Sequence, residues 1–226
     1  MRAFFRSPAG VSRPVPVPDS PARPRGGRLL TGAAAALIAA GSAVLGFDAC
    51  QNSGPPQPAP GAARPGAASP PPGPALAASK PTRVDIPRLG IHSRLLSLGL
   101  AHDGTLEVPS LKEAQLAGWY DKGPTPGERG PAVIVGHVDT KKGPAVFYKL
   151  GRLKPGDKVD VTRKDGAVAA FTVDSVERVS KAHFPTKRVY GEVGFAGLRL
   201  ITCGGDFVGH HYTGNTIVYG HLTTHH

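Results

Sequence analysis

The sequence predicts an all-β domain, a closed barrel or a sandwich, in residues 82–226, behind a long N-terminal extension. Three observations support this prediction. Aromatic and β-branched residues become frequent only from Thr82 onward, whereas much of the proline lies before that residue. Many short strand-like runs follow, and turn-forming residues separate them. Short strands of this kind are typical of barrels and sandwiches, and the segment is long enough to bury a core of its own.

The extension divides into three segments by composition. Residues 1–28 are basic, and residues 29–47 form a 19-residue run without charge. A bilayer-spanning helix needs roughly 20 apolar residues, and preceding arginines favour a cytoplasmic N-terminus. We therefore expect a single-pass anchor in the cell membrane, with a cleaved signal peptide or lipidation at Cys50 as alternatives. All three place the residues after 50 outside the cytoplasm.

Residues 48–81 are rich in Pro, Ala, Gly and Ser. Such a composition buries too little apolar surface to offset the entropy of ordering. We expect a disordered, extended linker that lets residues 82–226 reach a target beyond the membrane.

The net charge of +11 is shared between the two parts of the chain. Eight basic residues against two acidic ones give residues 1–81 a charge of +6, which leaves +5 for residues 82–226. Nucleic acid is the partner to consider for a basic chain, but no basic stripe interleaved with aromatic residues and no nucleic-acid motif is present. The charge is better explained by a solvated surface near an anionic cell envelope.

The candidate strands alternate in polarity or are apolar throughout. They lie at residues 83–86, 105–107, 132–138, 158–163, 167–179, 198–203 and 216–220. Asp165-Gly166, between two alternating runs, is typical of a β-hairpin turn. Single helical turns are expected within residues 111–117 and 147–150.

Two apolar runs each end at a side chain suited to catalysis. Residues 198–202 lead to Cys203, which Gly204 and Gly205 follow, and residues 132–136 lead to His137. A thiol attacks carbonyl groups as the thiolate, and a free cysteine is mostly protonated at neutral pH. A neighbouring histidine can remove that proton and later protonate the leaving amine. If the two strands are neighbours in one sheet, Cys203 and His137 meet in one groove.

The same residue types also suit structural roles or a metal site. A single cysteine is often a small buried hydrophobic residue, and a histidine at a strand end is often structural. Cys203, His210, His211 and His221 could also hold zinc, but no Cys-x-x-Cys pair or His-x-x-x-His helix supports a metal site. We expect no metal and no cofactor.

The chain resembles the sortases, the membrane-anchored cysteine transpeptidases of Gram-positive bacteria. The resemblance rests on residues 135–140 (VGHVDT) and 200–205 (LITCGG), and on supporting similarities at residues 84–91, 147–150 and 184–191. It covers about residues 82–222 and is strongest to the actinobacterial class E and class F groups, with class F the closer.

This resemblance implies an eight-stranded sortase β-barrel in residues 82–226. Cys203 would attack the Thr–Gly bond of an LPxTG-like sorting signal on a surface protein and form a thioester. An amine of a peptidoglycan precursor or of a pilin would then resolve the thioester, with His137 as general acid and base.

The sequence departs from the sortase pattern at one position. Sortases carry an arginine at the start of the strand after the cysteine, and Thr213 stands at about that place here. Arg188 is a weak candidate to replace it. The alternative is a sortase-like peptide-binding module at the cell surface that is weakly active or inactive.

Overall fold

The computed structural model describes residues 54–64 and 75–225. The expected cytoplasmic segment and the expected anchor lie outside these residues. Within the described ranges, no helix combines the length and the apolar character that crossing a bilayer requires.

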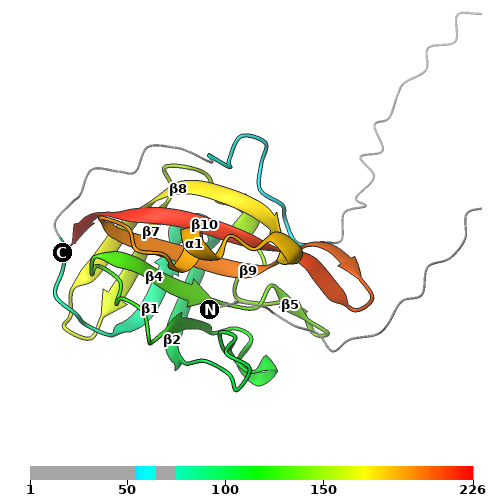
Figure 1. Cartoon of the computed structure of the whole chain (residues 1–226), viewed down its shortest axis with the longest axis horizontal. Coiled ribbons are helices and arrows are strands. Elements are labelled where there is room, and N and C mark those ends of the chain that lie inside the picture. The colour runs from blue at the N-terminus through cyan, green and yellow to red at the C-terminus, as the bar shows by residue number, and fades with distance from the viewer. Residues whose placement is uncertain (1–53, 65–74, 226) are drawn as a thin grey trace, which may run out of the picture. The chain divides into compact units, whose positions relative to one another are not determined.

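Eight strands close into one barrel (Figure 1). In barrel order they are β1 (Pro81–Ile86), β2 (Ile91–Leu98), β3 (Ala117–Tyr120), β4 (Gly130–Val135), β9 (Ala196–Val208), β10 (His211–His225), β8 (Val168–Ser180) and β7 (Lys158–Arg163). Strand β1 pairs with β7 and closes the circle. The β2–β3 and β4–β9 pairs are parallel, and the others are antiparallel. The prediction of an all-β closed barrel is confirmed.

Short elements decorate the barrel. Strands β5 (Asp139–Thr140) and β6 (Gly143–Pro144) form a separate two-stranded sheet. The helices are the 3-10 helices η1 (Pro87–Leu89), η2 (Leu111–Glu113), η3 (Leu150–Arg152) and η4 (Lys181–His183), and the α-helix α1 (Thr186–Tyr190). In Figure 1, α1 lies over the β9 and β10 region, and the β9–β10 hairpin extends to the right.

The strand predictions hold best where the sequence pattern is strong. Strand β7 has the predicted bounds, and β8 runs unbroken through the segment predicted from Ala167. The Asp165-Gly166 turn joins them, with Thr162 opposite Val168. Strand β9 is longer than predicted because it continues past Cys203 to Val208.

The structure contradicts several of the weaker predictions. Residues 105–107 form no strand, and only an isolated bridge joins Leu100 to Leu106. Strands β2 and β3 were not predicted. In β2 the adjacent pair Leu95-Leu96 breaks the polar–apolar alternation, and β3 has only four residues. The helical turns are real but begin at Leu111 and Leu150.

Buried side chains form two clusters, one inside the barrel and one on its outer surface. The first includes the fully buried Phe147, Phe171 and Leu200. The second contains Val135 and Ile201 and is covered by Val189 of α1. Because β4 and β9 are covered on both faces, their sequences are continuously apolar, as expected for buried parallel strands.

Two stretches of the expected linker contact the barrel. In residues 54–64, the carbonyl of Ala62 accepts a hydrogen bond from the backbone N–H of Val176 (2.9 Å), and Ala62 is buried. Near Ser79, the backbone N–H donates to the hydroxyl of Thr125 at 3.1 Å. Strand β8 pairs with β7 only through Val168–Thr172, so the first stretch lies along the edge of β8 that β7 leaves open.

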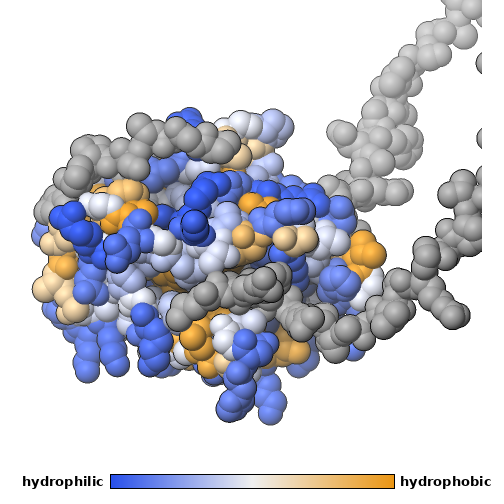
Figure 2. All heavy atoms as spheres, viewed as in Figure 1, coloured by the Kyte–Doolittle hydropathy of each residue, from blue (hydrophilic) through white to orange (hydrophobic). Residues whose placement is uncertain are grey.

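The visible surface of the described residues is mostly hydrophilic, with small separate apolar patches (Figure 2). Two of the exposed large hydrophobic residues, Phe207 and Val208, lie in the β9–β10 hairpin near its tip.

The two environments of phenylalanine give a test of the core. Phe147→Ala removes a fully buried ring from the barrel interior and is expected to lower the free energy of unfolding by roughly 3–5 kcal/mol. Phe207→Ala, the matched control, removes a ring that is 61% exposed and is expected to cost less than about 1 kcal/mol. Chemical denaturation of the full chain measures both, and equal losses would contradict this core assignment.

Candidate active site

The parallel pairing of β4 with β9 brings His137 and Cys203 to the same end of the sheet. Val135 pairs with Ile201 in the last registered step. The alignment continues through the N–H of Gly136, which donates to the carbonyl of Ile201 at 3.1 Å, and the hydroxyl of Thr202, which donates to the carbonyl of Gly136 at 2.8 Å. His137 lies two residues past the end of β4, and Cys203 lies two residues past Ile201 within β9, so the register leads both residues to the same end of the sheet.

Hydrogen bonds fix the orientation of His137. Its Nε2 lies 2.6 Å from the carbonyl oxygen of Pro109, and its own carbonyl accepts from the N–H of Phe147 at 3.0 Å. A carbonyl oxygen can only accept, so Nε2 carries the hydrogen. In the neutral ring Nδ1 is therefore the nitrogen that can take a proton.

Cys203 is a free, half-buried thiol on β9. Burial raises its pKa above the ordinary value, because the charged thiolate loses contact with water. Two neighbouring charges act in opposite directions: the ammonium group of Lys181 lowers the pKa of Cys203, and the carboxylate of Asp139 raises it. Sequence reasoning missed Lys181, which precedes Cys203 by 22 residues and lies on another element.

The two glycines after the thiol continue the strand and do not form a turn. They lie within β9, where Gly204 leaves room for a side chain of β10 and Gly205 adopts a left-handed backbone conformation. A Cβ on Gly204 would lie 2.7 Å from Oγ1 of Thr216, and Gly205 has a φ of +85°. Side chains at these positions would push β10 away from the strand that carries the thiol.

Asp139 follows His137 by two residues and binds the hairpin beyond the thiol. Its Oδ2 accepts a hydrogen bond from the hydroxyl of Tyr212 on β10. Burial and this bond both raise the pKa of Tyr212. The ring of Tyr212 lies edge-on to Phe207 with centroids 5.0 Å apart. The loop carrying His137 is thus connected to the β9–β10 hairpin.

Arg188, the arginine suggested by sequence, and the nearby Arg199 are engaged away from Cys203. Arg188 pairs with Glu177 at 3.0 Å and lies over the ring of Tyr219. Arg199 is buried beneath the same ring, and burial lowers its pKa to about 10. Thr213 uses its hydroxyl to accept the N–H of Asp206 at 3.2 Å.

The residues considered for zinc do not gather. His221 pairs with Gly197, six residues before Cys203 on β9, and its Nδ1 lies 2.6 Å from Asp174. Among residues 54–64 and 75–225, no three His, Cys, Asp or Glu side chains are grouped in a way that could hold a metal ion.

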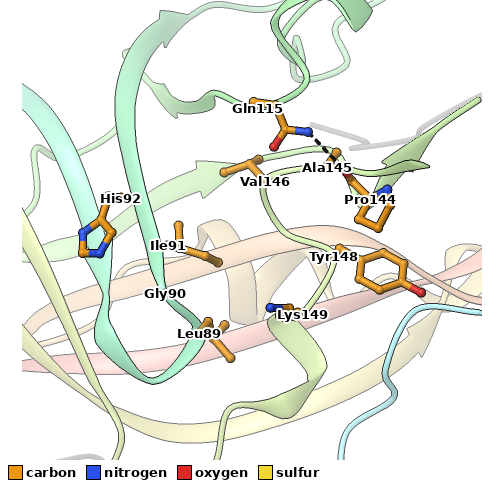
Figure 3. A pocket seen from close by; sticks show the side chains of 10 residues that line it. All are labelled: Leu89, Gly90, Ile91, His92, Gln115, Pro144, Ala145, Val146, Tyr148 and Lys149. Carbon is orange, nitrogen blue, oxygen red and sulfur yellow. Dashed lines mark hydrogen bonds between the residues drawn. The ribbon is translucent and has the colours of Figure 1, made fainter. Parts of the chain in front are cut away.

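A pocket of about 460 Å³ lies beside the loop that follows His137. Figure 3 shows the start of β2, including Ile91 and His92, on one side and residues 144–149 on the other. The side-chain amide of Gln115 donates to the carbonyl of Pro144 at 2.9 Å across its rim. Neither catalytic candidate lines this pocket.

Comparisons with known proteins agree with the barrel fold. Residues 84–223 match the family described as the Sortase domain. The fold is similar to sortase C-1 from Streptococcus pneumoniae, with 25% identity, a TM-score of 0.50, and coverage of 63% of this chain and 66% of that chain. It is also similar to sortase C-1 from Actinomyces oris, with 21% identity, a TM-score of 0.50, and coverage of 63% and 73%.

A third similar structure is the pilus-related sortase C of Group B Streptococcus, with 20% identity, a TM-score of 0.50, and coverage of 66% and 70%. The chain spans 60–73% of the length of the sortase structures it matches, and 66% of the first of them. A comparison with curated proteins found no match.

The carboxylate beside the thiol gives a test of the site electrostatics. Asp139→Asn removes a negative charge while keeping an oxygen that can accept from Tyr212. The pKa of Cys203 should fall, so its alkylation by iodoacetamide should become several-fold faster below the midpoint of the pH profile. The measurement uses the full chain carrying Cys50→Ser, so that one thiol reacts. Glu192→Gln, at an exposed carboxylate near α1, is the control and should leave the profile unchanged; a profile unaffected by Asp139→Asn would contradict the assignment.

Proposed function

Because this chain belongs to the sortase family, we propose that it is an active cysteine transpeptidase with Cys203 as nucleophile and His137 as general acid and base. One observation carries the proposal. The parallel β4–β9 register ends at Val135 and Ile201, two residues before His137 and Cys203, which supports a meeting of the imidazole and the thiol at one end of the sheet. Both side chains are half-buried, so they remain accessible to a substrate.

The first chemical step is acylation. Nδ1 of His137 takes the proton of Cys203, and the thiolate attacks the carbonyl carbon of the scissile peptide bond. The carbon–nitrogen bond then breaks, and the imidazolium gives its proton to the departing amine. The products are a thioester on Cys203 and a released C-terminal fragment.

The second step transfers the acyl group. An acceptor amine attacks the thioester carbon and loses a proton to His137, and the sulfur leaves as a thiolate. Water in place of the amine would give hydrolysis. The hydrogen bond from Nε2 to Pro109 keeps Nδ1 available in both steps.

The substrate we propose is an LPxTG-like sorting signal on a surface protein, cut between Thr and Gly. The acceptor is an amine of a peptidoglycan precursor or of a pilin subunit. The motifs at residues 135–140 and 200–205 support a class F-like assignment among actinobacterial sortases. We further propose that residues 29–47 anchor the chain in the cell membrane with residues 82–226 outside the cell.

A second function, peptide binding without efficient catalysis, has one observation in its favour. Burial raises the pKa of Cys203, so fewer molecules carry the reactive thiolate at neutral pH. A peptide that binds without forming a thioester would support this alternative.

The test is incubation of the full chain with LPxTG-like and LAxTG-like peptides and an amine, followed by mass spectrometry. We expect a Cys203 acyl adduct and transfer to the amine. Cys203→Ala and His137→Ala should each reduce cleavage by at least about 10³-fold, because nucleophile and base act as a unit.

His221→Ala is the control, because His221 is at a distant position on β10, paired with Asp174, and it should retain activity. Cleavage that persists in Cys203→Ala, or peptide binding with no adduct in the unmodified chain, would overturn the proposal.

A further inference from the structure

The buried position of Cys203 creates an electrostatic problem for a nucleophile. Burial raises the pKa of the thiol, and the nearby carboxylate of Asp139 raises it further. A nucleophilic cysteine generally has a positive group nearby that stabilises the thiolate. The site therefore needs a cation close to the sulfur.

The arginines of the neighbouring strands do not meet this need. Arg188 and Arg199 both lie over the ring of Tyr219, which pairs with Arg199 on β9, four residues before Cys203. At the usual rise per strand residue this is about 13 Å from the thiol position. Arg178 pairs with Asp206 at 3.1 Å. Its guanidinium lies 3.1 Å from the position of a Cβ on Gly205, two residues after Cys203, and the carboxylate of Asp206 offsets its charge there.

The strand register instead puts Val179, two residues before Lys181, in the same row as the thiol. Cys203 pairs with Asn215 on β10, and Asn215 pairs with Val179 on β8. Val179 packs against the outer cluster, so this row of residues shares the face of Cys203. Lys181 follows Val179 by two residues and is the first residue of η4. The hydroxyl of Ser180 caps this helix by accepting a hydrogen bond from the N–H of Ala182 at 3.2 Å.

The distance is suitable for a lysine. Neighbouring strands lie about 4.8 Å apart and each residue rises about 3.3 Å, so the Cα of Lys181 lies about 12 Å from that of Cys203, across β10 and two residues along. The flexible four-carbon stem of lysine can span much of this gap. Asn215, between the two, is buried and donates its amide to the carbonyl of Thr202 at 3.3 Å, so it brings no charge of its own.

We propose that Lys181 is the cationic partner of Cys203, holding the sulfur as a thiolate from across β10. This inference rests on the proposed function, in which Cys203 is the nucleophile. The charge on Lys181 acts on Cys203 in the required direction. The other titratable groups around the thiol are His137 after β4, Asp139 on β5, Tyr212 on β10 and the Arg178–Asp206 ion pair, whose arginine is neutralised by its own carboxylate.

The test measures the thiol directly and does not depend on a substrate. The full chain carrying Cys50→Ser is alkylated with iodoacetamide across pH 6–10. Lys181→Met keeps the length and removes the charge, Lys181→Arg keeps the charge, and Lys187→Met removes an exposed lysine of α1 as the matched control.

We expect Lys181→Met to move the alkylation profile to higher pH and to slow the reaction at neutral pH by roughly tenfold, the effect of losing one nearby opposite charge. Lys181→Arg should keep most of the original rate, and Lys187→Met should match the unmodified chain. Lys181→Gln repeats the measurement if Lys181→Met fails to fold.

An unchanged profile in the folded Lys181 variants, or an equal shift in Lys187→Met, would overturn the inference. The result is independent of the proposed function, since alkylation requires no sorting-signal peptide. A chain that shows the Lys181 effect but forms no peptide thioester would retain the electrostatic assignment and refute the transpeptidase proposal.

Discussion

The parallel contact between β4 and β9 is the constraint on which the site depends. These strands are far apart in the sequence, yet their register pairs Val135 with Ile201, two residues before His137 and Cys203. The barrel core covers the inner face of this pair, and α1 covers the outer face. Because both faces are buried, the register of the two strands is fixed. A slip of one residue would turn the thiol to the opposite face and separate it from the imidazole.

The sequence predicted the parts of this arrangement that are encoded locally. Continuous apolar runs identified β4 and β9, and alternation with an Asp-Gly turn identified β7 and β8. The sequence could not predict β2 and β3, because short strands with irregular alternation acquire their conformation from their neighbours. The function of His137 and Cys203 was suggested by motif, but their alignment required the fold.

The charges around the thiol were the least predictable part. Asp139 lies in a recognisable motif, whereas Lys181 and Tyr212 reach the site only through the pairing of β8, β10 and β9. No local pattern distinguishes Lys181 from the other lysines. The arginine candidate chosen from sequence, Arg188, is held by Glu177 and Tyr219. Long-range register therefore decides which cation faces the sulfur.

The stretch at residues 54–64 has a practical consequence for handling this protein. Ala62 and Arg64 cover Ser175 and Val176, where β8 extends beyond its partner β7. A recombinant fragment beginning at the first barrel strand would expose that backbone edge, and uncovered edges template intermolecular pairing and aggregation. A soluble fragment for crystallisation should accordingly begin at or before Gly54.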